Sequence, residues 1–310
     1  MLKIEKTEVV GWEAAIRGMR NPMNSWEKSD SAYCHRDLVR DCITCVHHDT
    51  GYSACTAGHF DVGPKDYDLM TRLHNAGTDH RKFMRMLIVY MDITAPLYWW
   101  KEFKTYRAGR KFGDDEPDII DDGYLEYDIE MNSCSTMHKI AAKEFTLSDF
   151  SCEHLSGRYD DGLIHPDSPL GQLRETVGWL NQYRDIFIHW DSVDSTRKAL
   201  FLVREKKDAW WQMIQLLPSS YNQKRTVMLS YEVLANIYKS RRHHKLDEWH
   251  TFCDWIEGLP YSELITGGLR DINIADEWNK FGHVNYVPGM KPNCKVVITK
   301  EGETSNAQTE

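Results

Sequence analysis

The stretch MLIVYMDITAPLYWWKEFKTYR, residues 86–107, changes its character halfway along. Its first part, Met86–Ile93, is a continuous apolar run that contains β-branched and aromatic side chains. Such a run is typical of a strand covered on both faces, and it is too short for an independent helix. Thr94 then suits the N-cap of a helix whose first turn holds an Ala-Pro pair, and Gly109 can end that helix after Arg107. The stretch therefore predicts a buried strand that leads directly into a helix.

The expected helix has an aromatic face. Trp99, Phe103 and Tyr106 lie at positions i, i+4 and i+7, which places their side chains on one stripe. Glu102 falls on the neighbouring stripe. We therefore expect one carboxylate beside an aromatic wall.

The rest of the chain reads as a mixture of strands and helices. A first strand is expected over Leu2–Val10, and the polar cluster that begins at Asn132 is expected to lead into a helix. Periodic apolar patterns, with Gly and Pro at their ends, predict helices over Glu13–Met19, Asp66–Asn75, Leu170–Trp190, Lys206–Leu217, Thr226–His243 and Leu246–Leu259.

The helix expected over Thr226–His243 carries Arg241 in its last turn. Ser230, Leu234, Ile237 and Arg241 lie on one stripe of this helix, so Arg241 should point inward with the apolar residues. The alternative is a favourable interaction of its charge with the C-terminal end of the helix dipole.

Composition limits the function classes. The chain has 310 residues, 41% of them hydrophobic, and no apolar run approaches the length of about eighteen residues that a membrane span requires. The opening MLKIEKTEVV lacks the layout of a signal peptide, so a cytoplasmic protein without a membrane partner is expected. A net charge of -9 argues against general binding of nucleic acid.

Three basic clusters stand out against the acidic background, at residues 80–85, 106–111 and 239–245. If folding brings them together, they would bind an anion, and phosphate is the obvious ligand. The strongly acidic run at residues 111–130 is read as a solvated insertion, with calcium binding by its carboxylates as the alternative.

A cysteine and histidine segment lies within residues 34–59. Cys42 and Cys45 have the C-x2-C spacing of half a zinc site, which Cys55 and His59 would complete. The alternative is a set of unpaired buried cysteines, since disulfides are not expected in the cytoplasm.

Over most of residues 1–265 the chain resembles the flavin-dependent thymidylate synthases. That family has a histidine ahead of a buried strand, where this chain has His80, and an Ala-Pro that opens the next helix, as here before Leu97. Later, a Leu-Pro precedes an Asn by twelve residues and a nucleotide-phosphate Arg by eleven more. Pro218, Ser230 and Arg241 keep those spacings.

The chain departs from the family at several motif positions. Glu102 stands in place of a substrate-contacting Gln, and Thr105-Tyr106-Arg107 stands in place of the hallmark Arg-His-Arg. The motif Asn-Glu-x-Ser-x-Arg-Tyr is replaced by Asn132–His138, in which Ser133 and Met137 take the places of the Glu and the Arg. Ile214 stands where the family has another arginine.

The resemblance implies an α+β protein with the thymidylate synthase-complementing-protein-like fold, which has a central, mostly antiparallel sheet and long helices. It implies one domain over residues 1–270, with insertions near 34–59 and 110–131, and a C-terminal extension over 271–310. It also implies a homotetramer with FAD in each site between subunits. NADPH would be the reductant, and methylenetetrahydrofolate would donate a one-carbon unit to C5 of a pyrimidine nucleotide.

The resemblance also assigns residues. His80, Arg107, Asn132 and Tyr106 would contact the flavin, while Glu102, Ser135 and Arg241 would bind the nucleotide, with Glu102 and Ser135 in catalytic positions. Structural alternatives are that Glu102 pairs with a cation of its own helix, that Ser135 caps a helix beginning at Thr136, that Asn132 serves a turn and that Tyr106 belongs to the core.

Two functional hypotheses follow from the substitutions. Because a carboxylate only accepts hydrogen bonds, where an amide both donates and accepts, Glu102 favours a base with an amino group, such as cytosine. The alternative is an inactive family member that binds nucleotide or flavin as a regulatory protein.

Overall fold

The computed structural model describes residues 2–33, 60–106, 129–157, 159 and 162–267. All of the predicted insertion at 34–59, most of the acidic insertion and all of the extension at 271–310 therefore lie outside the described residues. Within the described ranges, no helix is both long enough and apolar enough to cross a membrane.

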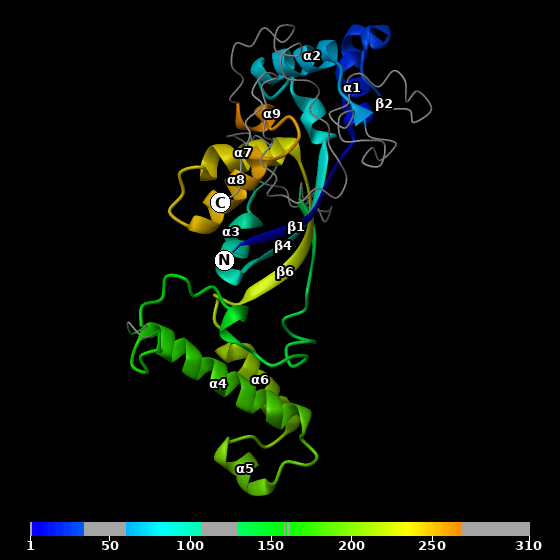
Figure 1. The fold of residues 1–310 in the computed structure, drawn as a ribbon. Helices are drawn as coiled ribbons and strands as arrows, with labels where there is room; N and C mark the ends of the chain where they lie inside the picture. The colour runs from blue at the N-terminus through cyan, green and yellow to red at the C-terminus, as the bar shows by residue number, and fades with distance from the viewer. Residues whose placement is uncertain (1, 34–59, 107–128, 158, 160–161, 268–310) are drawn as a thin grey trace, which may run out of the picture. The chain divides into compact units, whose positions relative to one another are not determined.

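The central element is a sheet of four antiparallel strands, drawn as arrows in Figure 1. Its order is β1 (Lys3–Val10), β4 (Ile88–Pro96), β6 (Asn222–Ser230) and β5 (Ile129–Ser133). β2 (Ala32–Tyr33) and β3 (Phe60–Asp61) form a separate antiparallel pair. The α+β class, the first strand and the buried strand in the stretch at residues 86–107 are thus confirmed.

Contacts group the chain into two compact units, and strands β4 and β6 each contribute residues to both. The first unit comprises Met1–Lys3, Asp92–Thr105 and Met131–Thr226, and the second comprises Ile4–Met91, Tyr106–Glu130 and Val227–Glu310.

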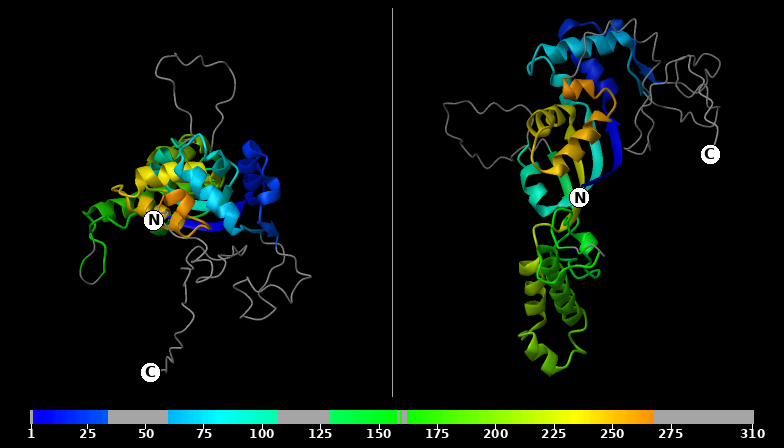
Figure 2. Two further views of the ribbon diagram at one scale, coloured as in Figure 1. Left: turned by 90° about the horizontal axis from the view of Figure 1, so that it is seen from above. Right: turned by 60° about the vertical axis from the view of Figure 1, so that its left-hand side comes forward.

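The first unit contains a pair of long helices, α4 (Pro169–Ile188) and α6 (Lys206–Leu216), which lie side by side in both Figure 1 and Figure 2. The Ser168 hydroxyl accepts a hydrogen bond from the Gly171 N–H and caps α4, and a proline occupies the first helical position. The short helices η6 (Leu147–Asp149) and α5 (Ser195–Leu200) complete this region. Buried apolar side chains between the helices include Phe150, Leu180 and Met213.

The second unit is built from helices around α7 (Tyr231–Arg241). Helix α7 packs against α8 (Asp247–Glu257), α9 (Glu263–Thr266) and the 3-10 helix η5 (Lys82–Arg85). The other helices of this unit are α1 (Trp12–Arg20), η1 (Asn21–Met23), η2 (Trp26–Lys28) and α2 (Pro64–Asn75).

The helix that follows β4 begins later and ends earlier than the sequence predicts. Strand β4 continues to Pro96, so Pro96 and not Thr94 is the N-cap of α3 (Leu97–Phe103). The Leu97 N–H donates to the Tyr221 carbonyl at 3.0 Å, which keeps this part of the chain extended in the sheet. Of the predicted aromatic stripe, Trp99 and Phe103 stack at 4.7 Å, whereas Tyr106 lies beyond the end of the helix.

The long helix predicted over Thr226–His243 is wrong in its first part. Its first five residues lie in β6, and Ser230 caps α7 by accepting a hydrogen bond from the Val233 N–H at 3.4 Å. Burial alternates along β6, but two of the buried positions hold Gln223 and Arg225. Because these side chains are polar, the period of two was hidden from an analysis of apolar residues.

The helix predicted after Asn132 is also absent from the described residues. The Ser135 hydroxyl accepts hydrogen bonds from the N–H groups of Met137 at 3.2 Å and His138 at 2.8 Å, but only turns follow. This local motif satisfies the same backbone donors that a helix cap would.

Asp66 organises the α1–α2 region of the second unit. Its fully buried carboxylate binds Arg20 Nε at 2.6 Å and the hydroxyls of Ser29 and Ser31, each at 2.6 Å. Burial alone would raise the pKa of Asp66, but the hydrogen bonds from both serines and from Arg20 outweigh it and hold the pKa below its ordinary value.

We predict that Asp66→Asn lowers the free energy of unfolding by about 3–5 kcal/mol at pH 7, because Arg20 is left buried without a counter-charge. A carboxylate with a depressed pKa in the folded state stabilises above its unfolded pKa of about 4, and this contribution disappears as pH falls through the folded pKa. The variant should therefore lose part of the acid sensitivity of the wild type in urea denaturation followed by tryptophan fluorescence.

The matched control is Asp68→Asn, which removes an exposed i,i+4 pair with Arg72 on the same helix. This substitution should change the free energy of unfolding by less than about 0.5 kcal/mol. Equal stability of the two variants would contradict the role assigned to Asp66.

Candidate functional site

Arg241 and Tyr106, which the sequence places in two separate motifs, are in direct contact in the second unit. Arg241 Nε donates a hydrogen bond to the Tyr106 hydroxyl. The guanidinium carbon lies 4.8 Å from the ring centroid of Trp249 and 5.4 Å from that of Tyr106. The two rings meet edge to face at 5.7 Å, and Trp249 is fully buried. The cation is therefore held against two aromatic rings, an arrangement that fixes the plane of its fork.

Local structure explains why Arg241 reaches this place. It lies in the last turn of α7, whose inward stripe of Leu234 and Ile237 is fully buried. The predicted inward direction is consistent with its half-buried side chain and its contact with Trp249 of α8. The position at the C-terminal end of the helix also favours a cation.

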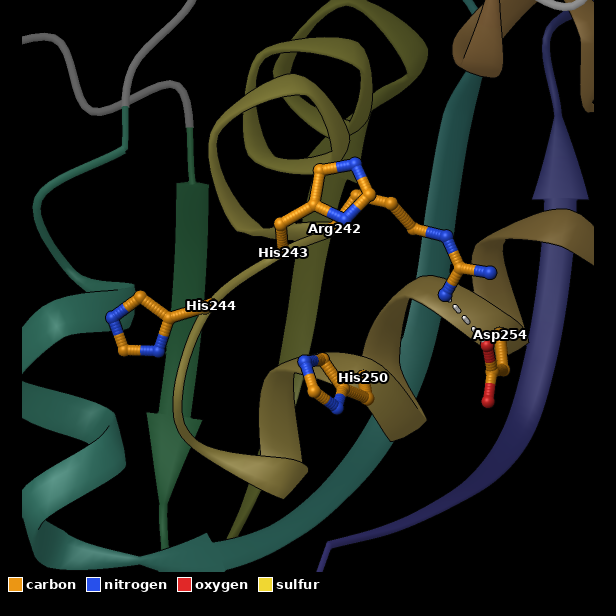
Figure 3. Close-up of a pocket in the computed structure, with 5 residues that line it drawn as sticks. All are labelled: Arg242, His243, His244, His250 and Asp254. Carbon is orange, nitrogen blue, oxygen red and sulfur yellow. Dashed lines mark hydrogen bonds and ion pairs between the residues drawn. The ribbon is translucent and has the colours of Figure 1, made fainter.

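A hollow of about 580 Å³ lies beside this cluster, at the turn between α7 and α8 (Figure 3). Its lining consists entirely of ionisable side chains, namely Arg242, His243, His244, His250 and Asp254. The sequence pointed to the first three through the basic cluster at 239–245. It gave no signal for the two residues on α8, because only the packing of α8 against α7 brings them there.

The charge of Arg242 is balanced in this hollow. Its Nη1 lies 2.9 Å from Asp254 Oδ1 and its Nη2 lies 3.2 Å from Glu257 Oε1. Burial alone would lower the pKa of Arg242, but the carboxylates of Glu257 and Asp254 outweigh it and raise that pKa. Burial and a hydrogen bond to Glu257 raise the pKa of Tyr238 to about 12.

His244 has a defined hydrogen-bonding role. Its Nδ1 accepts from the Leu246 N–H at 3.2 Å, so Nε2 carries the proton of the neutral ring. Across the described part of the chain, no group of three or more His, Cys, Asp or Glu side chains could hold a metal ion.

The basic cluster at residues 80–85 is used differently from the prediction. Arg81 and Arg85 lie 3.3 Å and 3.8 Å from the fully buried carboxylate of Glu232 in the first turn of α7. These two arginines therefore neutralise a buried acid in addition to any contact with solvent. His80 beside them is exposed, and its backbone N–H donates to the Gly77 carbonyl.

Three predicted site residues belong to the first unit. Glu102 is half-buried in the last turn of α3, and its backbone carbonyl accepts from both the N–H and the hydroxyl of Thr105. Asn132 is exposed on β5, so it does not serve a turn. Ser135 is exposed just beyond β5, with its hydroxyl oxygen anchored by two backbone N–H groups.

A buried arginine in the same unit was missed by the sequence analysis. The Arg225 guanidinium stacks 4.3 Å from the Trp100 ring centroid, and its Nε and Nη2 donate to Gln223 Oε1. Its Nη1 lies 3.1 Å from the sulfur of Met131, and burial lowers its pKa. The sequence signal that could have identified Arg225 was its position on the buried side of a strand along which burial alternates.

The remaining predicted positions are Arg107 and the zinc candidates Cys42, Cys45, Cys55 and His59. All five lie outside the described residues. The other predicted site residues are described by the structure. Glu102, Asn132 and Ser135 belong to the first unit, while His80, Tyr106 and Arg241 belong to the second.

No protein-family model matches the chain, and no curated protein matches it. Solved structures that are similar to it include two thymidylate synthases. Thymidylate synthase X from Helicobacter pylori with FAD and dUMP is 14% identical, with 86% of this chain and 97% of that chain covered and a TM-score of 0.47. A flavin-dependent thymidylate synthase from the same organism, complexed with FAD and dUMP, is 15% identical, with 86% and 100% covered and a TM-score of 0.47. Likenesses this distant assign neither a family nor a site to the chain.

Proposed function

We propose that the chain binds FAD and a pyrimidine deoxynucleotide and transfers a one-carbon unit from methylenetetrahydrofolate to C5 of the base, with NADPH as reductant. The observation that carries this proposal is the contact between Arg241 and Tyr106. The two residues are 135 positions apart, and each was singled out from a different motif of the resemblance. Their meeting in one cluster supports a shared site.

Arg241 is the residue proposed to bind the nucleotide phosphate. An arginine fork binds phosphate through parallel N–H bonds, and this binding is stronger when the fork is already oriented. Tyr106 fixes one edge of the guanidinium through its hydroxyl, and Trp249 supports its face. The aromatic pair therefore reduces the entropy that Arg241 would lose on binding.

The residues proposed for the flavin have suitable chemistry. His80 and Asn132 are both exposed and carry side-chain donors and acceptors for the polar edge of an isoalloxazine ring. Tyr106 offers an aromatic ring, and Arg107 follows it in sequence. When bound, FAD supplies the redox and carbon-transfer chemistry, while the protein supplies orientation and charge.

Glu102 and Ser135 are the residues proposed to recognise the base. The carboxylate of Glu102 can accept a hydrogen bond from a ring N–H or an exocyclic amino group. The oxygen of Ser135 already accepts two backbone N–H bonds, so its own O–H is oriented to donate to an acceptor on the substrate. Together they would select the base through its pattern of donors and acceptors.

The proposal includes a homotetramer whose subunits share each site. In the single chain, large apolar side chains remain exposed on the long helices, with 45% exposure for Trp179 of α4 and 42% for Trp211 of α6. Such side chains are enriched in the contacts between subunits. Sedimentation velocity of the purified protein should find a species of four chains, and a monomer at all concentrations would contradict this part of the proposal.

Arg241→Ala should weaken nucleotide binding about 10- to 100-fold, because a charge-assisted hydrogen bond contributes about 1.5–3 kcal/mol. The measurement is calorimetric titration with dUMP and dCMP, alongside flavin absorption with and without added FAD. The matched control is Arg242→Ala, which removes the neighbouring charge that Asp254 and Glu257 already balance. Equal affinity of both variants would contradict the assignment of Arg241.

Turnover separates the enzyme from a regulatory binding protein. With FAD, NADPH and labelled methylenetetrahydrofolate, the proposal expects label in the product nucleotide. Tight binding of nucleotide and flavin without transfer of label would replace the proposal with the inactive alternative.

Glu102 should determine the choice of base. We expect the wild type to bind dCMP more tightly than dUMP, because a carboxylate pairs with the amino group of cytosine and repels the carbonyl at the same position of uracil. Glu102→Gln should shift the ratio of the two affinities toward dUMP by about tenfold or more, since one mismatched polar contact costs about 1–3 kcal/mol. An unchanged ratio would show that Glu102 does not contact the base.

A further inference from the structure

Two leucines beside the short helix α5 are more exposed than any other large apolar side chains of the described chain. Leu200 is 77% exposed and Leu202 is 87% exposed. Helix α5 lies at one end of the α4–α6 pair, so these leucines stand on a projecting end of the helices (Figures 1 and 2). Apolar surface in water is unfavourable, and nothing within the first unit covers it.

The backbone at Leu202 is strained in a way that keeps this leucine outward. Its φ of 55° is left-handed, a conformation that usually belongs to glycine. The Val203 N–H donates to the Lys198 carbonyl and the Leu202 N–H donates to the Ala199 carbonyl, as in the Schellman motif that ends many helices. A leucine at this position is unfavourable both for its conformation and for its exposure. Burial of the side chain in an apolar phase would be favourable, and the free energy gained would compensate for both costs.

Positive charge surrounds the two leucines. The segment RKALFLVREKK, residues 197–207, holds five cations and one carboxylate, and with Asp194 and Asp208 at its ends the net charge over residues 194–208 is +2 in a chain whose total is -9. We call this segment the arm tip. Cations lie on both sides of its apolar centre, with Lys198 before it and Arg204, Lys206 and Lys207 after it. This arrangement is typical of a surface that meets an apolar layer covered by anions.

Aromatic rings hold some of these cations near the arm tip. Lys198 Nζ lies 4.3 Å from the ring centroid of Trp190, and Lys206 Nζ lies 5.0 Å from that of Phe187. Arg197 is also bound by Asp185 at 2.8 Å, so its charge is largely balanced. The charge of Arg204 helps to lower the pKa of the nearby Asp208. The lysines are therefore the cations that remain for a partner, and the stacked ones have lost part of their freedom already.

We propose that the arm tip binds the surface of an anionic phospholipid bilayer. Leu200 and Leu202 would enter the boundary between headgroups and acyl chains, and the cations around them would contact lipid phosphates. A peripheral contact of this kind needs no membrane-spanning helix, but it departs from the expectation of the sequence analysis that the protein has no membrane partner. The competing partner is an acidic protein. A projecting end with two leucines close together in sequence fits a flat layer better than the groove of such a protein.

The test is cosedimentation of the full-length chain with vesicles of phosphatidylcholine, with and without phosphatidylglycerol. The wild type should bind only the anionic vesicles, more weakly as salt rises, and its tryptophan emission should shift to the blue on binding. Leu200→Ser with Leu202→Ser should weaken binding about 100-fold, at about tenfold for each leucine withdrawn from the acyl boundary. Lys206→Glu with Lys207→Glu should weaken it about tenfold or more.

The matched control is Leu163→Ser, which changes a leucine that is 65% exposed in the same unit but lies outside the arm tip. It should bind vesicles as the wild type does, and the circular dichroism of all variants should match. Three results would overturn the proposal: no binding of the wild type to anionic vesicles, wild-type binding by the double-leucine variant, or binding of polyglutamate in place of vesicles. A change of sedimentation coefficient in the double-leucine variant without a change in vesicle binding would assign these leucines to the contact between subunits.

Discussion

The antiparallel pairing of β4 with β6 is the constraint on which the other features depend. At one end of the pair the Leu97 N–H donates to the Tyr221 carbonyl, and at the other the Tyr231 N–H donates to the Leu87 carbonyl. Helix α3 leaves the first end and α7 begins at the second. The register of two strands that are far apart in sequence therefore fixes where the helices carrying Glu102 and Arg241 start, and a slip by one residue would turn each strand's side chains to the opposite face.

The role of a cation in this protein depends on whether it faces a buried carboxylate, and not on the composition alone. Arg81 and Arg85, which the sequence assigns to a candidate anion site, are used inside the protein to neutralise the buried carboxylate of Glu232, and Arg20 does the same for Asp66. Arg225 is buried without a carboxylate, since its guanidinium donates to the neutral side chain of Gln223 and stacks on the ring of Trp100. A buried ion must be matched because transfer from water is costly, so the structure commits these cations before any ligand arrives.

The motif departures are easier to understand around Arg241. A tyrosine at position 106 accepts a hydrogen bond from the guanidinium and presents its ring to the same cation. Trp249 completes the arrangement from α8. Tyr106 thus supports the neighbouring arginine through both its hydroxyl and its ring. Under the proposed function, a carboxylate at position 102 would change which base fits, because it can only accept hydrogen bonds.

Local signals in the sequence determined the strand at residues 3–10, the buried strand and the helices α2, α4 and α6, because apolar period, caps and the proline after α6 act within a few residues. The sequence also marked Tyr106 and Arg241, but not their contact. Tertiary structure alone decided that Thr94 and the start of the predicted long helix lie in strands, since hydrogen bonds between distant strands outweigh helix signals. It likewise decided that Glu232 binds the arginines of η5, because only packing of α7 against η5 brings a buried acid to them.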